Sequence, residues 1–110
     1  RAPDPACNPY LAFSVLLAAG IKGITEEYPV PPPVEGNMFS MSQEELNARG
    51  ISSLPGTLGE AISLAEKSDL IQQTLGEPTS SSLIRNKQIE WDKYRATVTD
   101  YEVRNYLPQL

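Results

Sequence analysis

The stretch from Tyr10 to Ala19 constrains the fold of this chain more than any other, because Ser14 is its only polar residue. Asn8 and Pro9 precede it and form a typical helix start. The Asn side chain can accept from free backbone N–H groups, and Pro lacks only a donor that would be unpaired there. A helix that is apolar on all sides is buried on all sides or lies in a membrane. This run is well short of the ~20 residues needed to cross a bilayer, so we expect other protein surface to cover it.

The overall composition limits both the covering surface and the chemistry. A chain of 110 residues suits one domain, and its hydrophobic fraction of 40% is modest for a globular protein. The net charge of -5 argues against nucleic acid as a partner, because phosphates attract clustered Lys and Arg. The sequence has no His, which excludes Ser-His-Asp and Cys-His catalysis and any zinc site that uses His.

The residues before the apolar run bear on where the protein is found. Cys7 is the only cysteine, so it cannot form an internal disulfide, and this fits a reducing compartment. The residues before Tyr10 lack the basic cluster of a secretory signal peptide. We therefore expect a cytoplasmic protein that does not associate with membranes, and the absence of an initiator Met at Arg1 suggests a longer parent.

Capping signals predict a mostly α chain with no convincing strand. A Ser or Thr followed three residues later by Glu is a capping box, and it marks helix starts at Ser42, Thr57 and Thr99. The first helix is expected to fray at Gly20 and Gly23. Together with apolar spacing, these signals predict five or six helices, at about residues 8–24, 42–49, 57–67, 68–75, 78–97 and 99–107.

Two segments could contact other molecules. A long loop over residues 25–41 contains Pro29–Pro33, which favours polyproline II. It is either a stiff spacer, which the composition favours, or a ligand for an aromatic groove. The short last helix is rich in tyrosine and must either dock or fray. A free-standing helical protein-interaction module is therefore one interpretation of the chain.

Five sequence blocks, each present once, are spread along almost the whole chain. They are Arg1-Ala2-Pro3-Asp4-Pro5, Asn8-Pro9-Tyr10-Leu11-Ala12-Phe13, Pro31-Pro32-Pro33-Val34-Glu35-Gly36-Asn37, Leu54-Pro55-Gly56-Thr57-Leu58-Gly59-Glu60-Ala61 and Glu90-Trp91-Asp92-Lys93-Tyr94-Arg95. In this order they resemble the C-terminal part of a bacterial or archaeal type I glutamine synthetase. The resemblance implies that residues 1–110 are a helical, C-terminal piece of a larger α+β catalytic domain.

The resemblance also implies a reaction. Members of this family are ligases of glutamine biosynthesis and nitrogen metabolism. They join ammonia to glutamate through γ-glutamyl phosphate, and they use ATP and two Mg²⁺ or Mn²⁺ ions. Its sites lie between neighbouring subunits of a double ring of six. The family's metal carboxylates and ATP contacts lie outside this chain, so we expect it to contain no catalytic and no metal-binding residue and to be inactive alone.

Five positions of this chain match family positions with a role. Arg1 matches an arginine that contacts the substrate glutamate, although a solvated arginine is the alternative. Phe39 lies where some members carry a tyrosine that is adenylylated to switch the enzyme off. In relatives the C-terminal helix inserts into the opposite ring, and its expected interface residues here are Val103, Tyr106 and Leu107.

Overall fold

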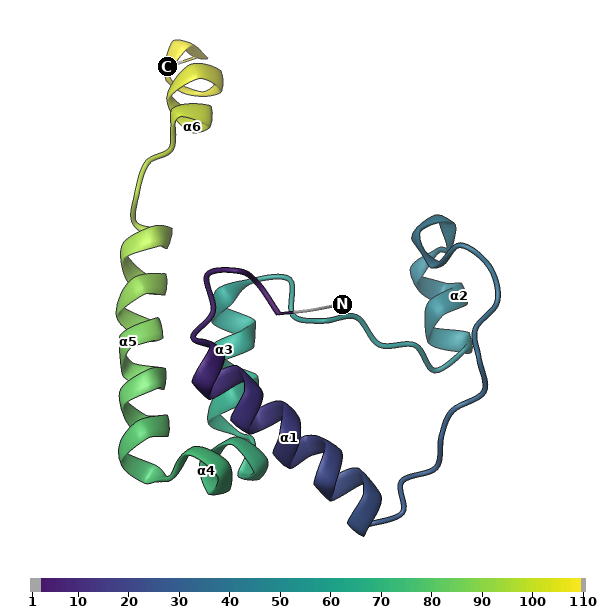
Figure 1. The fold of residues 1–110 in the computed structure, drawn as a ribbon. Helices are drawn as coiled ribbons and strands as arrows, with labels where there is room; N and C mark the ends of the chain where they lie inside the picture. The colour runs from purple at the N-terminus through teal and green to yellow at the C-terminus, as the bar shows by residue number, and fades with distance from the viewer. Residues whose placement is uncertain (1–2, 110) are drawn as a thin grey trace.

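The computed structural model describes residues 3–109, and all regular structure within that range is helical (Figure 1). The predicted mostly α fold class is therefore confirmed. The α-helices are α1 (Pro9–Thr25), α2 (Gln43–Ala48), α3 (Leu58–Glu66), α4 (Asp69–Leu75), α5 (Glu77–Arg95) and α6 (Asp100–Asn105). Two short 3₁₀ helices, η1 (Met38–Ser40) and η2 (Leu107–Gln109), complete the elements.

Helices α1, α3, α4 and α5 form the body of the molecule. α1 packs on α4, α3 packs on α5, and α4 joins the two pairs through its contacts with α5. Ile62 of α3 is the only buried hydrophobic residue among those that the structure describes. Gly59 lets α3 approach closely, because a Cβ at this position would lie 2.8 Å from the indole of Trp91 in α5.

A single glycine forms the junction between α4 and α5. Gly76 has a φ of 74°, in the left-handed region that glycine tolerates, and it ends α4 and precedes α5. α5 begins at Glu77, one residue before the expected start, and its first turn contains the buried Ser80. The Ser80 hydroxyl donates to the Gly76 carbonyl at 2.9 Å, so burial leaves it with a partner.

Two parts of the chain extend away from this body (Figure 1). The arm, residues 26–57, carries η1 and α2, and neither makes extensive contact with another described element. The tail, residues 96–109, carries α6, which packs on η2. The radius of gyration is consequently 18.3 Å, whereas a compact domain of this length has about 13 Å.

The bounds of α1 lie within one residue of the predicted helix over residues 8–24. The Asn8 side chain accepts from the backbone N–H groups of Tyr10 and Leu11 at 3.0 and 3.4 Å. The expected fraying at Gly20 and Gly23 is wrong, because the helix continues through both to Thr25. Its end is set by Glu27, which adopts a φ of 51° while the N–H of Tyr28 donates back to the carbonyl of Gly23.

Two of the three predicted capping boxes are complete. At Ser42 and at Thr99 the hydroxyl accepts from the backbone of the glutamate three residues on, whose carboxylate accepts from the capping N–H. The box at Thr57 is only half formed. Glu60 Oε2 accepts from the N–H of Gly56 at 2.8 Å, one residue before the cap. The loop residue Gly56 thereby gains the partner that the sequence pattern assigned to Thr57.

The capping box of α6 makes the tail sensitive to acid. The Thr99 backbone N–H donates to the Glu102 carboxylate at 2.7 Å, and this hydrogen bond lowers the pKa of Glu102. A carboxyl whose pKa is lower in the folded state stabilises that state above its unfolded pKa of about 4.3 and loses the contribution as pH falls through the lower value. We expect the amide proton signal of Thr99, followed by NMR during acidification, to shift with a midpoint below about 4.3.

The variant Glu102→Gln is the control for this titration, since its neutral side chain keeps an acceptor oxygen. Its Thr99 signal should show no transition in the acid range. A wild-type midpoint at or above the ordinary glutamate value would contradict the capping box in solution.

Candidate functional site

Phe39 lies on the arm, within the short turn of η1. The Asn37 side chain accepts from the backbone N–H of Phe39 at 3.1 Å, and the Ser40 hydroxyl donates to the Asn37 carbonyl at 2.8 Å. These local bonds fix the backbone, while Phe39 as a whole residue is 88% exposed. The turn therefore presents residue 39 outward, as a position that an external surface or enzyme can reach.

The three expected interface residues gather at the end of the tail. Val103 lies in α6, Tyr106 caps that helix, and Leu107 begins η2. All three side chains are more than two-fifths exposed. The ring of Tyr101 meets that of Tyr106 edge-on, with centroids 6.2 Å apart. This contact joins Tyr101 to the apolar cluster, and it was missed because the sequence does not show which face of so short a helix is shared.

A groove runs between α3, α4 and α5, with a volume of about 820 Å³. Its apolar lining includes Ala65, Ile84 and Ile89, and its charged lining includes Glu66 and Arg85. The sequence did not indicate this groove, because its sides come from three helices whose packing is decided over long range. It lacks His and Cys, and we assign it no catalytic role.

The remaining site predictions concern metal, membrane and substrate. Within residues 3–109 no three His, Cys, Asp or Glu side chains are grouped so that they could hold a metal ion. The described helices include none that is long and apolar enough to span a membrane. Arg1, the predicted glutamate contact, lies outside the described residues.

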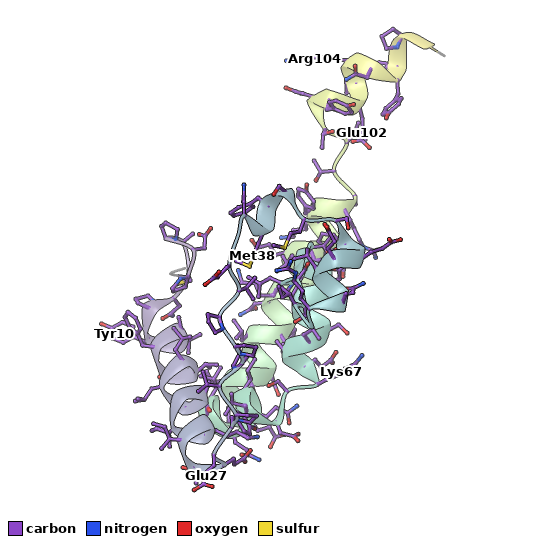
Figure 2. All side chains as sticks on the ribbon, turned by 90° about the vertical axis from the view of Figure 1, so that its right-hand side faces the viewer. Tyr10, Glu27, Met38, Lys67, Glu102 and Arg104 are labelled. Carbon is purple, nitrogen blue, oxygen red and sulfur yellow. The ribbon has the colours of Figure 1, made fainter. Side chains whose placement is uncertain are left out.

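The predicted positions within residues 3–109 do not converge on one site. Met38, next to Phe39, lies on the arm, whereas Glu102 and Arg104 mark the tail, which projects beyond the end of α5 (Figure 2). In Figure 1 the arm and the tail lie on opposite sides of the body. Such an arrangement, with exposed apolar residues on separate projections, suits contacts with several surrounding protein surfaces better than chemistry within this chain.

Comparison with known proteins gives one consistent result. Residues 1–106 match the family described as "Glutamine synthetase, catalytic domain". The chain is 49% identical over 107 residues to the glutamine synthetase of Mycolicibacterium smegmatis, and 46% identical to those of Mycobacterium tuberculosis H37Rv and Methanocaldococcus jannaschii. Each alignment covers 97% of this chain and 24% of the relative, so the chain spans about a quarter of these proteins.

Proposed function

The chain belongs to the glutamine synthetase catalytic-domain family, and we propose that it is the C-terminal portion of an ATP-dependent glutamate–ammonia ligase. The observation that carries this proposal is the family match, which runs almost from end to end over residues 1–106. The family makes glutamine, and it generally uses ATP and divalent metal ions. In the parent of this chain we expect γ-glutamyl phosphate as the intermediate, Mg²⁺ or Mn²⁺ as the metal, and a cytoplasmic location.

The described residues supply no fitting metal site, so no metal-dependent step is assigned to them. Arg1 is the residue of this chain that would contact the substrate. A guanidinium remains charged at all working pH values and can donate two parallel hydrogen bonds to one carboxylate. It would therefore bind and orient the substrate glutamate, while ATP and the metal ions are held by the rest of the ligase.

Phe39 implies a difference in regulation. It occupies the position where some family members are adenylylated on a tyrosine hydroxyl, and phenylalanine has no oxygen to accept the nucleotide. Its 88% exposure makes the position accessible, so the missing hydroxyl, and not burial, would prevent adenylylation. We propose that the parent enzyme is not controlled in this way.

The tail would serve assembly. Val103, Tyr106 and Leu107 are exposed residues of α6, its cap and η2, and these elements make no extensive contact with the described body. Aromatic residues of this kind are typical anchors of protein interfaces. They are the residues with which this subunit would insert into the opposite ring of a double hexamer.

A chimeric enzyme tests the proposal. The first three quarters of the M. smegmatis enzyme are joined to this chain in place of its own last quarter, and glutamine formation from glutamate, ammonia and ATP is measured with Mg²⁺. We expect the chimera to be active and the purified 110-residue chain to show no activity above background.

Two results would contradict it. A chimera that assembles into oligomers but makes no glutamine would remove the support for a ligase role. Activity of the 110-residue chain alone would contradict the division of the site between this chain and the rest. If the chain were instead a free-standing interaction module acting through Pro29–Pro33, it could not replace the last quarter of the ligase, and the chimera would be inactive.

A further inference from the structure

The residues just before α1 form a turn that is held by hydrogen bonds to one residue, Asp4. The N–H of Cys7 donates to the carbonyl oxygen of Asp4 at 3.0 Å, which closes a turn over residues 4–7. Inside this turn the N–H of Ala6 donates to the Asp4 carboxylate at 2.8 Å. Asp4 therefore holds the turn through its backbone and through its side chain at once.

The sequence of the turn favours this conformation. Asp is preferred at the first position and Pro at the second position of the commonest β-turn, and Asp4 and Pro5 occupy these two positions. The short Asp side chain can reach the N–H two residues further on. Pro3 and Pro5 each have a nearly fixed φ, and Pro5 also disfavours the helical region for Asp4. Few other conformations therefore compete with the turn.

The turn leads directly into the capped start of α1. Asn8 follows it with an extended backbone, at a φ of -73° and a ψ of 112°, and its side chain accepts from the N–H groups of Tyr10 and Leu11. Residues 3–8, which we call the connector, are thus fixed to the end of a 17-residue helix. Figure 1 shows that the chain bends as it leaves α1 toward the N-terminus.

Packing against the described helices contributes little to the shape of the connector. Residues 3–6 are exposed, and Cys7 is half-buried. Of residues 3–7, Asp4 alone has a side chain that accepts a hydrogen bond from this stretch. An exposed segment with few buried contacts opens locally at low cost. Loss of the Asp4 carboxylate should therefore change the direction of the connector without unfolding the helices.

We propose that Asp4 is a positioning residue for the substrate glutamate, because its turn sets the direction in which the chain leaves α1 toward Arg1. The inference rests on the proposed function, in which Arg1 binds that glutamate. Arg1 precedes Asp4 by only three positions, so the chain between them is too short to correct a wrong direction. A displacement of about 1 Å in a binding group is enough to weaken catalysis strongly.

The test uses the M. smegmatis chimera and its steady-state kinetics. Asp4→Ala is expected to raise KM for glutamate about fivefold, because loss of a hydrogen bond of typical net strength lowers the fraction of connectors that are ready to bind. The values of kcat and of KM for ATP should stay within about twofold of wild type, because bound glutamate itself holds Arg1 in place. A change in KM for glutamate of less than about twofold would overturn the proposal.

Two single variants are the controls. Asp4→Asn removes the charge but keeps an acceptor oxygen, so it should keep the wild-type KM for glutamate. Ser42→Ala removes another exposed side chain that accepts from a backbone N–H, that of Glu45 at 3.2 Å, but it lies on the arm and should leave KM unchanged. Either control with the same rise as Asp4→Ala would overturn the proposal. Size-exclusion chromatography should show the same oligomer for every variant, since Asp4 is exposed.

A double variant shows whether Asp4 acts through Arg1. In an Arg1→Ala enzyme the connector has no guanidinium to position, so adding Asp4→Ala should not raise KM for glutamate further. Independent effects of the two substitutions would multiply instead. A full additional fivefold rise would mean that Asp4 does not act through Arg1, and the positioning role would then be wrong.

Calorimetric titration of glutamate into the assembled chimera separates this proposal from the proposed function, because it needs no turnover. A chimera that binds glutamate but makes no glutamine would contradict the ligase function alone, and weaker binding by its Asp4→Ala variant would still support the positioning role. An active chimera whose Asp4→Ala variant keeps the wild-type KM and the wild-type affinity for glutamate would overturn the positioning role alone.

Discussion

In a full-length ligase that ends in this chain, Arg1→Ala is expected to lower kcat/KM for glutamate by about 30- to 4,000-fold. This range corresponds to the 2–5 kcal/mol, roughly, that is lost when one partner of a buried, hydrogen-bonded charge pair is truncated. The substrate carboxylate would enter its pocket without the guanidinium that compensates its lost water. Steady-state kinetics of the M. smegmatis chimera, with glutamate varied at saturating ATP and ammonia, measure the effect.

The charge and the shape of Arg1 can be separated. Arg1→Lys keeps the charge but not the fork of two donors, so its loss should lie between wild type and Arg1→Ala. Lys67→Ala removes an equal charge at an exposed position after α3 and should leave the kinetics unchanged. An Arg1→Ala enzyme with an unaltered kcat/KM for glutamate would mean that Arg1 is a solvated residue with no role in substrate binding.

Gly59→Ala is expected to destabilise the body by about 1–3 kcal/mol, because the new methyl group overpacks the contact between α3 and α5. Its Cβ would lie 2.8 Å from both Cε2 and Nε1 of Trp91, closer than side-chain atoms approach. The indole would have to move, although its ring also stacks on Tyr94 with centroids 5.9 Å apart. Urea titration followed by Trp91 fluorescence and by circular dichroism measures the change.

The same substitution at Gly20 is the control and should have the opposite sign. Gly20 lies inside α1 with open space around its Cβ position, so alanine should stabilise that helix by about 0.5–1 kcal/mol. Equal destabilisation by both variants would show that the backbone, and not the indole, decides the outcome at Gly59.

Helix starts were predictable because their cause is local. The side chains of Asn8, Ser42 and Thr99 accept hydrogen bonds from N–H groups two or three residues away, so a short stretch of sequence contains both partners. The fold class followed from such signals, and the family followed from the resemblance of the sequence blocks. Both were confirmed.

Features with several local solutions were not predictable in the same way. Glu60 had two N–H groups within reach and took that of Gly56. α1 passes through both glycines and ends at Thr25, where the left-handed backbone of Glu27, two residues on, turns the chain. The groove between α3, α4 and α5 depends on which helices pack together, and that is decided by residues far apart in sequence.

The length of α5 determines where the tail lies relative to the body. Its 19 residues correspond to a rod of about 28 Å, and the apolar cluster of the tail is attached at the far end of that rod (Figure 1). Adding or removing one residue in α5 would turn the tail by about 100° around the helix axis and shift it by about 1.5 Å. The number of residues in α5 therefore sets both the distance and the direction at which the tail cluster projects from the body, independently of which side chains form the cluster.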